Sequence, residues 1–195
     1  MNITKYFNSS SEFVGLLELC FPEFPIGKDL RKILINLFPM IERNCLFYLC
    51  DGELAGFVVY NSFHIKKYEK NINFEKLLTA PKKIRKALRL SPIHPLSIIF
   101  DEFQIFRNGC FSYNRILALG VKPEFRGNRI SIHLLNAILE NDDKFVVITY
   151  SLESFDFVYS KCGFELVTQW YNKYSMKNVY LLVRGRKNRL LNTSI

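Results

Sequence analysis

The spacing of apolar residues predicts two helices near the start of the chain. Apolar side chains recur every three or four positions over 13–20 and again over 30–38, which places them on one face of a helix. Serines at 9–11 offer N-cap oxygens before the first of these segments. Because proline disrupts the helical hydrogen-bond pattern, Pro22 and Pro39 predict where the two helices end.

Segments rich in β-forming residues predict three strands in the same region. A short one lies at 3–7, and two longer ones lie at 44–50 and 53–63. Asp51 and Gly52 separate the two longer segments, and this pair favours a tight turn because glycine readily adopts positive φ. The sequence therefore predicts that these two strands form a hairpin.

The middle of the chain combines a basic segment with two further predicted strands. Residues 64–95 show helical spacing of apolar residues on both sides of a proline, which predicts an inserted helical pair. The segments 97–106 and 110–121 are rich in β-branched and aromatic residues, and Asn108-Gly109 between them predicts a second hairpin turn. This hairpin would follow the insertion directly.

Helices and strands alternate in the last third of the chain. A helix is predicted from Asn128, a strand at 144–150, a short helix at 154–162 and two strands at 164–171 and 175–183. A strand-helix-strand unit needs a parallel crossover, whereas hairpin strands pair antiparallel. We therefore expect an α+β fold with a mixed, mostly antiparallel central sheet that is flanked by helices.

Length and composition indicate a single folded domain over 1–195. Of the 195 residues, 49% are hydrophobic and 18 are Phe, so the chain can bury a substantial core. The first residues lack the pattern of a secretion signal, and no uninterrupted apolar stretch approaches the length of a membrane span. We therefore expect a soluble, cytoplasmic protein. The sequence does not indicate its oligomeric state.

The positions of cysteine and histidine do not indicate a metal site. The five cysteines include no CxxC pair, and the three histidines are scattered along the chain. Reduced thiols are the expected state, and we expect no metal cofactor. Cys162, which has apolar neighbours, is better explained as a buried structural thiol than as a nucleophile.

The net charge of +9 is concentrated in two segments. The insertion at 64–95 carries nine Lys or Arg against two Glu, and the tail at 184–195 carries four Lys or Arg. Such patches favour anionic partners, although a solvated helix face with a solubilising tail explains them equally well. Nucleic acid is the weaker candidate partner, because the insertion lacks interleaved exposed aromatic residues and no nucleic-acid motif occurs.

One segment combines the features of a phosphate-binding site. A predicted strand ends at Val121, Pro123 begins a turn, and Arg126-Gly127 leads into an amphipathic helix. Backbone N–H groups and the positive end of a helix converge at such a turn, where they can hold a phosphate. Arg126 and Arg129 add cations beside it. Taken alone, the same residues also fit an ordinary loop before a surface helix.

A second segment downstream supports the phosphate-binding interpretation. The residues from Phe157 to Glu165, with the sequence F-V-Y-S-K-C-G-F-E, follow another predicted strand and helix. Together the two segments resemble the GCN5-related N-acetyltransferase (GNAT) family, in which V-x-P-x-x-R-G-x-G-x-G/A binds a pyrophosphate and Y-x-x-x-G-F follows downstream. The resemblance is close over 116–165, and 44–63 resembles the family's second and third strands.

This resemblance implies an acyl donor with a pantetheine arm and a pyrophosphate, namely acetyl-CoA or another acyl-CoA. It implies that main-chain groups of Leu119, Gly120 and Val121 pair with the pantetheine arm. It also implies that Tyr159 donates a proton to the departing thiolate, for which the alternative is a core aromatic residue. The resemblance places six residues around the pyrophosphate: Arg126, Gly127, Asn128, Arg129, Ile130 and Ser131.

The sequence departs from the family pattern at four positions. Arg129 and Ser131 stand where the family usually has glycine or another small residue. If the loop needs a positive φ at Arg129, the side chain costs about 1–2 kcal/mol, so either the loop differs or Arg129 contacts phosphate directly. Leu152 and Val147 stand where some members have an asparagine and a glutamate.

The implied reaction is direct acyl transfer from a thioester to an amine, either a small molecule or a protein, without a covalent enzyme intermediate. An alkyl amine, with a pKa near 10.4, must lose a proton, and Asp101, Glu102 and Tyr113 are the candidate bases. Two alternatives stay open. The basic insertion would receive an acidic acyl carrier protein as the donor, or the chain would be a non-catalytic binding module for anionic partners.

Overall fold

The computed structural model describes residues 2–5, 7, 9–21, 27–42, 44–61, 95–140 and 144–185. The predicted basic insertion, except for Pro95, and the tail beyond Gly185 lie outside these residues. The helices and binding roles predicted for them therefore stay predictions. Among the helices that are described, none is long and apolar enough to cross a membrane.

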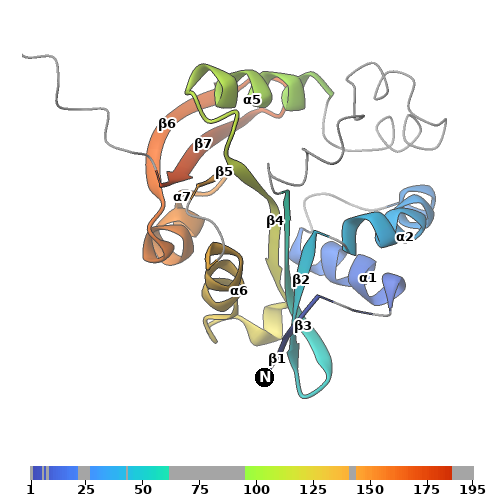
Figure 1. Ribbon diagram of the computed structural model, residues 1–195. Helices are drawn as coiled ribbons and strands as arrows, with labels where there is room; N and C mark the ends of the chain where they lie inside the picture. The colour runs from blue at the N-terminus through green and yellow to red at the C-terminus, as the bar shows by residue number, and fades with distance from the viewer. Residues whose placement is uncertain are drawn as a thin grey trace, which may run out of the picture.

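A sheet of seven strands runs through the described part of the chain, in the order β1-β2-β3-β4-β5-β7-β6 (Figure 1). Neighbouring strands pair antiparallel, except that β4 and β5 are parallel. The predicted mixed, mostly antiparallel sheet is confirmed. The strands are β1 Asn2–Thr4, β2 Cys45–Cys50, β3 Glu53–Asn61, β4 Asn114–Val121, β5 Phe145–Thr149, β6 Glu165–Asn172 and β7 Lys177–Arg184.

Helices cover both faces of this sheet (Figure 1). One face carries α6 and the helical turns that follow β5, while α1, α2 and α5 pack on the other face. The turns after β5 run from α7 through η3 to η4 without a break. The longer helices are α1 Ser10–Cys20, α2 Lys28–Glu42, α5 Pro95–Arg107 and α6 Ile130–Leu139, and the short ones are η2 Pro123–Phe125, α7 Leu152–Ser154, η3 Phe155–Tyr159 and η4 Ser160–Cys162.

The core forms because alternate residues of each strand point to opposite faces of the sheet. On β5, Val147 packs in the cluster beneath α6, whereas Val146 packs with Ile105 of α5. Beneath α1, the ring of Phe13 meets the rings of Phe47 and Phe57 edge-on, at centroid distances of 5.8 and 5.1 Å. These contacts fix both helical layers on the sheet.

Local signals at the hairpin and at the first helix act as predicted. Asp51 and Gly52 both have positive φ, 52° and 85°, which a two-residue turn between β2 and β3 requires. The Ser9 hydroxyl caps α1 by accepting a hydrogen bond from the Glu12 N–H at 3.3 Å. The helix ends at Cys20, ahead of the proline that predicted its end.

The segment predicted as a strand at 97–106 belongs to helix α5, so that prediction is wrong. The buried face of α5 repeats every four residues, and Ser97, Asp101 and Ile105 on it are 0%, 7% and 4% exposed. Two of these three positions are polar, so the helical spacing of apolar residues was not visible in the sequence. The β-branched and aromatic residues between them favoured a strand instead.

Asn108 and Gly109 form the C-terminal turn of α5 and not the predicted hairpin turn. The Cys110 N–H donates to the Ile105 carbonyl at 3.1 Å. Gly109, with φ at 71°, donates its N–H to the Phe106 carbonyl at 2.9 Å. This pattern is typical of a helix that ends at a left-handed glycine. The strand β4 consequently begins later than predicted.

Helix α2 also departs from the prediction, because it continues past Pro39 to Glu42. Phe38 is 5% exposed and belongs to the cluster beneath α1. Glu42 Oε1 accepts a hydrogen bond from the Phe7 N–H at 3.0 Å. These tertiary contacts stabilise the last turn and offset the helical hydrogen bond that a proline removes.

Candidate functional site

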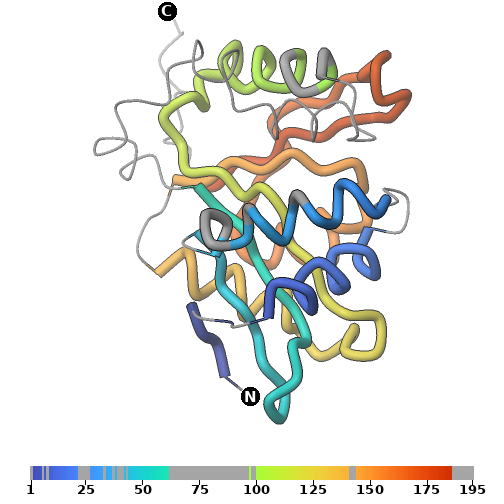
Figure 2. The backbone as a smooth tube through the Cα atoms, turned by 90° about the vertical axis from the view of Figure 1, so that its right-hand side faces the viewer, coloured from blue at the N-terminus to red at the C-terminus, as the bar shows by residue number. Residues whose placement is uncertain are grey.

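Strands β4 and β5 part halfway along β4. Within the described residues, Asn114–Ile116 of β4 pair with Phe145–Val147 of β5 and no later pair follows. Beyond this point β4 continues along β3 to Val121, while β5 continues along β7 to Thr149. Figure 2 shows the two strands diverging. The sheet is therefore open between them.

A β-bulge bends β4 where it leaves β5. The register with β3 shifts at this point, because Tyr60 pairs with Ile116 and Val59 pairs with Ala118, which leaves Leu117 as an extra residue. Bulges increase the bend and twist of a strand. The bulge thus accounts for the direction of the second half of β4, away from β5.

A cleft of about 710 Å³ lies beside this opening. Its walls come from the second half of β4, the loop and first turn of α6, the turns from α7 to η4, and Cys20 at the end of α1. The volume falls in the range of small-molecule sites. Eight of the nine residues predicted to bind the donor line it, with Asn128 as the exception: Leu119, Gly120, Val121, Arg126, Gly127, Arg129, Ile130 and Ser131.

The loop before α6 contains two residues with positive φ. Gly127 has φ at 88°, and Arg129, the residue before the first residue of α6, has φ at 59° and ψ at 18°. The left-handed region costs a residue with a side chain about 1–2 kcal/mol. The loop therefore keeps the positive φ at this position even though an arginine replaces the usual glycine, and such strain is typical of functional sites.

The first turn of α6 lines the cleft through Ile130, Ser131 and Ile132. Arg129 makes no side-chain hydrogen bond that would cap this helix, and no acidic residue lies in its first turn. The first N–H groups of a helix have no partner within the helix and lie at the positive end of its dipole. This end of the cleft consequently suits an anion.

Among the described residues, the charged side chains that line the cleft are three cations and one carboxylate. Arg126 and Arg129 come from the loop, and Lys161 comes from η4 across the cleft, together with Glu153 of α7. The Lys161 ammonium lies 5.9 Å from the ring centroid of Phe157, a lining residue whose side chain is 61% exposed. The excess of positive charge favours an anionic ligand.

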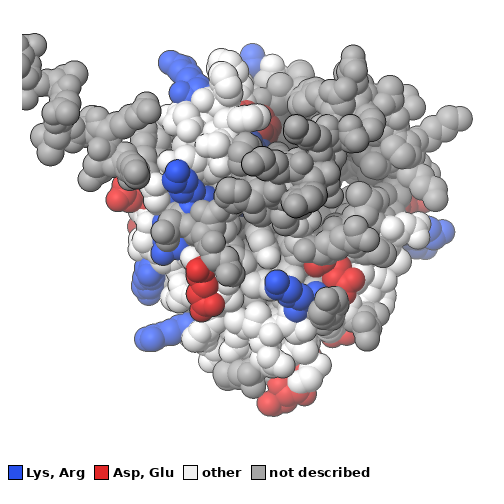
Figure 3. All heavy atoms as spheres, in the orientation of Figure 1, with Lys and Arg blue, Asp and Glu red and all other residues white. Residues whose placement is uncertain are grey.

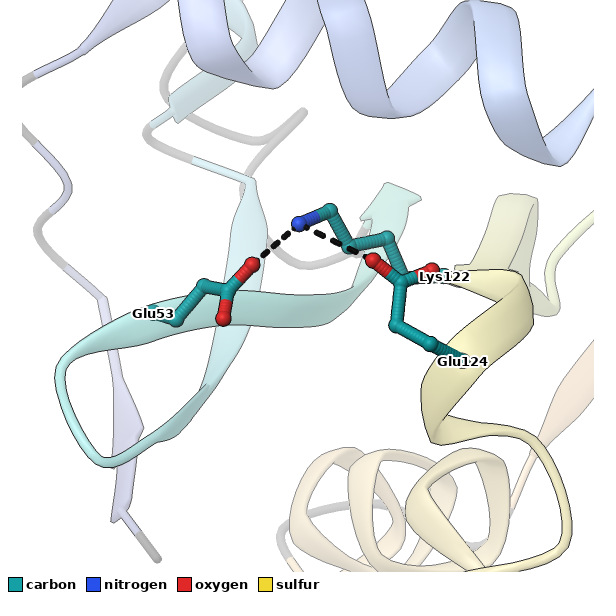
Figure 4. A network of polar contacts seen from close by, with 3 residues as sticks. All are labelled: Glu53, Lys122 and Glu124. Atoms are coloured by element: carbon teal, nitrogen blue, oxygen red, sulfur yellow. Dashed lines mark hydrogen bonds and ion pairs between the residues drawn. The ribbon is translucent and has the colours of Figure 1, made fainter.

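Lys122, the residue after β4, does not add to this positive charge. Its ammonium donates a hydrogen bond to Glu53 of β3 and lies 3.3 Å from Glu124 Oε1 of η2 (Figure 4). The hydrogen bond to Glu53 and the Glu124 carboxylate raise the pKa of Lys122. The two carboxylates offset its charge and tie the start of the loop to the β2-β3 hairpin.

The helix α6 approaches the sheet closely because β3 has a glycine beneath it. A Cβ atom on Gly56 would lie 3.0 Å from the Gly120 carbonyl oxygen and 3.0 Å from Ile130 Cγ2. Any larger residue would push the first turn of α6 away from β4. Gly56 therefore positions the first turn of α6 at the cleft.

Cys20 lines the cleft but is not in its reactive form. Burial raises the pKa of its thiol to about 11, against a smaller opposing effect of the Arg126 charge. The thiol is therefore protonated near neutral pH, and a protonated thiol is a poor nucleophile.

Tyr159 lies in the core beside the cleft. It is 7% exposed, and its ring packs edge-on against Phe164 at a centroid distance of 5.5 Å. Its chain neighbour Val158 lines the cleft, whereas Tyr159 itself is not among the lining residues. Burial raises the pKa of its hydroxyl. The ring thus packs as a core aromatic residue, and the role of the hydroxyl at the donor sulfur stays a prediction.

The three candidate bases lie in different surroundings. Asp101 and Glu102 are on helix α5. The sequence had predicted them on a strand, so that part of the prediction is wrong. Glu102 pairs with Arg115 of β4, and Tyr113 packs at the edge of the cluster between α5 and the sheet. Asp101 is buried among hydrogen-bond donors, which makes it the most unusual of the three.

Some site residues were not found from the sequence. Lys161 and Phe157 line the cleft from opposite ends of one helical turn, and their spacing of four residues could have indicated a shared face. Cys20 could not have been found, because only the packing of α1 on β4 brings it there. In the described part of the chain, no group of three or more His, Cys, Asp or Glu is placed to hold a metal ion.

Solved structures share this architecture. An N-acetyltransferase from Staphylococcus aureus Mu50 aligns with a TM-score of 0.62 at 18% identity, over 94% of this chain and 100% of that one. A Drosophila melanogaster polyamine N-acetyltransferase that catalyses the formation of N-acetylagmatine aligns with a TM-score of 0.59 at 18% identity, over 93% of this chain and 98% of that one. This chain has the GNAT fold.

The GNAT fold also extends to the NatC complex bound to Gag peptide and CoA, which aligns with a TM-score of 0.53 at 12% identity, over 94% of this chain and 98% of that one. No protein-family model matches the sequence, and no curated protein matches it significantly. The fold class predicted from the two motif segments is thus confirmed by three-dimensional similarity. The basic insertion predicted within this GNAT fold lies outside the described residues.

Proposed function

We propose that this chain is an N-acyltransferase that moves an acyl group from acyl-CoA to an amine. The observation that carries the proposal is the cleft beside the opening where β4 and β5 part. It joins an open strand edge at Leu119–Val121 to the N-terminus of α6 and to the cations Arg126 and Arg129. A strand edge suits an amide-bearing arm, and the helix end suits a pyrophosphate.

The donor would lie along the cleft with its two parts on different elements. Beyond Ile116, β4 has no strand partner on the β5 side within the described residues, so main-chain groups of Leu119, Gly120 and Val121 are candidates to bond the pantetheine amides. The residues 126–131 would surround the pyrophosphate. Each helix-end contact contributes about 0.3–1 kcal/mol, so several N–H groups and cations must act together.

The reaction would proceed by direct attack of the amine nitrogen on the thioester carbonyl carbon. The tetrahedral adduct then expels the thiolate, which needs a proton. Tyr159 is the proposed donor of that proton, and its raised pKa keeps its hydroxyl protonated near neutral pH. A covalent acyl-enzyme is not required, and the protonated thiol of Cys20 would form one poorly.

The acceptor class follows from the proteins with a similar fold. The Drosophila enzyme forms N-acetylagmatine, and NatC was solved with a peptide and CoA. Small cationic amines and peptide amino termini are therefore the first acceptors to examine. The acyl carrier protein is the alternative donor that the basic insertion suggested.

Calorimetry and a thiol-release assay test this proposal together. We expect acetyl-CoA to bind, and we expect thiol release to depend on an added amine from a panel with agmatine, spermidine and short peptides. Longer acyl-CoAs and an acetylated acyl carrier protein form separate arms that identify the donor. Absence of binding by every acyl-CoA and by the carrier protein would refute the proposal.

A further inference from the structure

The carboxylate of Asp101 is buried among neutral hydrogen-bond donors. Asp101, on α5, is 7% exposed. Its Oδ1 accepts hydrogen bonds from Trp170 Nε1 at 3.0 Å and from Asn172 Nδ2 at 2.8 Å. Its Oδ2 lies 3.5 Å from the Tyr150 hydroxyl, which donates to it. A buried carboxylate in such surroundings is costly to keep, which indicates a role beyond packing.

Asn172 holds this carboxylate in one orientation. Asn172 is 0% exposed, and its amide nitrogen also donates to Ser97 Oγ at 2.9 Å. Its Oδ1 accepts hydrogen bonds from the N–H groups of Tyr174 and Ser175, at 3.0 and 3.3 Å, in the turn between β6 and β7. The amide is thus fixed from both ends. Since Oδ1 of Asp101 takes two of the three donors, Oδ2 is left for Tyr150.

Tyr150 stands at the edge of the opening between β4 and β5. It follows Thr149, the last residue of β5, and β5 has no pair with β4 beyond Val147. Val146 and Ile148 pack on the α5 side of the sheet, so the alternation of the strand places Tyr150 on that side too, next to Asp101. Figure 2 shows that the turn between β6 and β7 lies toward the side of the molecule on which β4 and β5 diverge.

This position lies across the opening from the proposed donor strand. Residues Leu119–Val121 of β4 lie on one side of the opening, and Tyr150 directly follows β5, the strand on its other side. The donor would occupy the α6 side, where the cleft is lined by the loop and by η4. An amine that approaches the thioester from the α5 side would therefore come from the side of the sheet on which Tyr150 and Asp101 lie.

We propose that Tyr150 and Asp101 form a proton relay for the acceptor amine, which rests on the proposed N-acyltransferase function. The neutral amine nitrogen bonds to the thioester carbon and becomes positively charged. It then gives a proton to the Tyr150 oxygen, while the Tyr150 O–H proton passes to Oδ2 of Asp101. The C–S bond breaks and the thiolate leaves, and Asp101 later returns its proton to solvent. Tyr150 is the catalytic residue, and Asp101 acts through it.

The protonation states of the two groups agree with this geometry. Burial, with the Asp101 charge, raises the pKa of Tyr150 to about 12. The hydroxyl therefore stays protonated near neutral pH, so it can relay a proton but does not act as a free phenolate base. Burial also raises the pKa of Asp101, although its hydrogen bonds from Asn172 and Trp170 oppose the change. The neighbouring Glu102 on α5 raises it further.

One cation faces the relay from β7. The Lys177 ammonium lies 5.5 Å from the ring centroid of Tyr150. A cation at this position stabilises negative charge on the tyrosine, so it favours transfer of the Tyr150 O–H proton to Asp101. Among the described residues, the Asp101 carboxylate acts on the Tyr150 hydroxyl, Glu102 acts on Asp101, and Lys177 lies over the tyrosine ring.

The test compares Tyr150→Phe, Asp101→Asn and the double variant with the unaltered protein. Each is assayed with acetyl-CoA and the amine of the panel that the unaltered protein acetylates fastest. We expect each single variant to lose about 100-fold or more in kcat/KM, with acetyl-CoA affinity unchanged. Because the two residues act as one unit, the double variant should be no slower than the slower single variant.

The pH profile separates a relay from a structural role. In the unaltered protein kcat/KM should rise with pH both as Asp101 ionises and as the amine loses its proton. In Asp101→Asn the first of these rises should be absent, so the profile follows the free amine alone. Tyr171→Phe and Glu165→Gln, both at exposed positions of β6, serve as matched controls and should keep full activity.

Four outcomes would overturn the inference. Retained turnover in Tyr150→Phe would refute the relay by itself, even if Asp101→Asn failed to fold, because removal of a half-buried hydroxyl leaves the packing intact. Losses that multiply in the double variant, or an unchanged pH profile in a folded Asp101→Asn, would also refute it. Absence of turnover in the unaltered protein with every amine and donor would instead refute the proposed function, and the relay with it.

Discussion

The thiol of Cys20, at the end of α1, packs directly against Gly120, near the end of strand β4. A Cβ atom on Gly120 would lie 2.8 Å from Cys20 Sγ and 2.6 Å from Phe57 Cε1. Real side chains do not approach so closely, so this position needs a glycine. The contact couples the helix α1 to the part of β4 that lines the cleft.

Gly120→Ala should destabilise the protein through this contact. Overpacking in a well-packed core costs about 1–3 kcal/mol, and we expect a loss of that size in the free energy of unfolding in urea. Acetyl-CoA affinity should fall as well, because β4 must shift. A Cβ atom on Gly27 would meet nothing within 4 Å, so Gly27→Ala is the matched control. An equal effect of both substitutions would contradict the packing argument.

Arg129 allows conformation and charge to be separated. Arg129→Gly removes the side chain and relieves the left-handed strain at φ 59°, whereas Arg129→Ala removes the charge and keeps the strain. If Arg129 contacts the pyrophosphate, both variants should bind acetyl-CoA roughly tenfold more weakly, as calorimetry can measure. The glycine variant should unfold at the higher temperature of the two. Arg107→Ala, an exposed arginine at the end of α5, is the control.

Tyr159→Phe tests the proposed proton donor. Loss of general-acid catalysis should lower kcat by about 100-fold, while the fold and the acetyl-CoA affinity stay unchanged. Tyr48 belongs to the same core cluster and is 5% exposed, so Tyr48→Phe is a matched removal of a buried tyrosine hydroxyl. Unchanged turnover in Tyr159→Phe would leave this tyrosine with a packing role alone.

Cys20 should react slowly with alkylating reagents near neutral pH. Burial raises the pKa of its thiol to about 11, so the reactive thiolate forms only as the pH rises toward that value. Alkylation by iodoacetamide, followed by mass spectrometry, should therefore accelerate continuously from pH 7 to pH 10. Acetyl-CoA should protect the thiol because Cys20 lines the cleft. Fast alkylation at pH 7 without protection would contradict both expectations.

The features that could be predicted from the sequence depend on neighbours in the chain. Asp51 and Gly52 specify a hairpin turn by their own φ preferences, and the serine before α1 caps it without outside help. The segment from Leu119 to Ser131 was recognisable for the same reason, because strand, turn and helix N-terminus follow one another directly. Eight of the nine residues predicted there line one cleft.

The features that could not be predicted depend on contacts between distant segments. Helix α5 buries Ser97 and Asp101 because Asn172 and Trp170, more than 65 residues away, supply hydrogen bonds that no local pattern reveals. Helix α2 passes Pro39 because Phe38 is packed in the core. In the same way, Tyr150 could not be recognised as a candidate site residue from the sequence, because its proposed role depends on the Asp101 carboxylate beside it.

The sequence by itself determined the fold class and the place of the loop that we propose binds the pyrophosphate, since turn chemistry, helix caps and hydrophobic periodicity are local properties. Only the tertiary structure decided where β4 and β5 part, which residues line the cleft, and that Asp101 faces Tyr150. These depend on strand register, on a bulge at Leu117 and on hydrogen bonds across the sheet, and such properties emerge only when distant segments pack together.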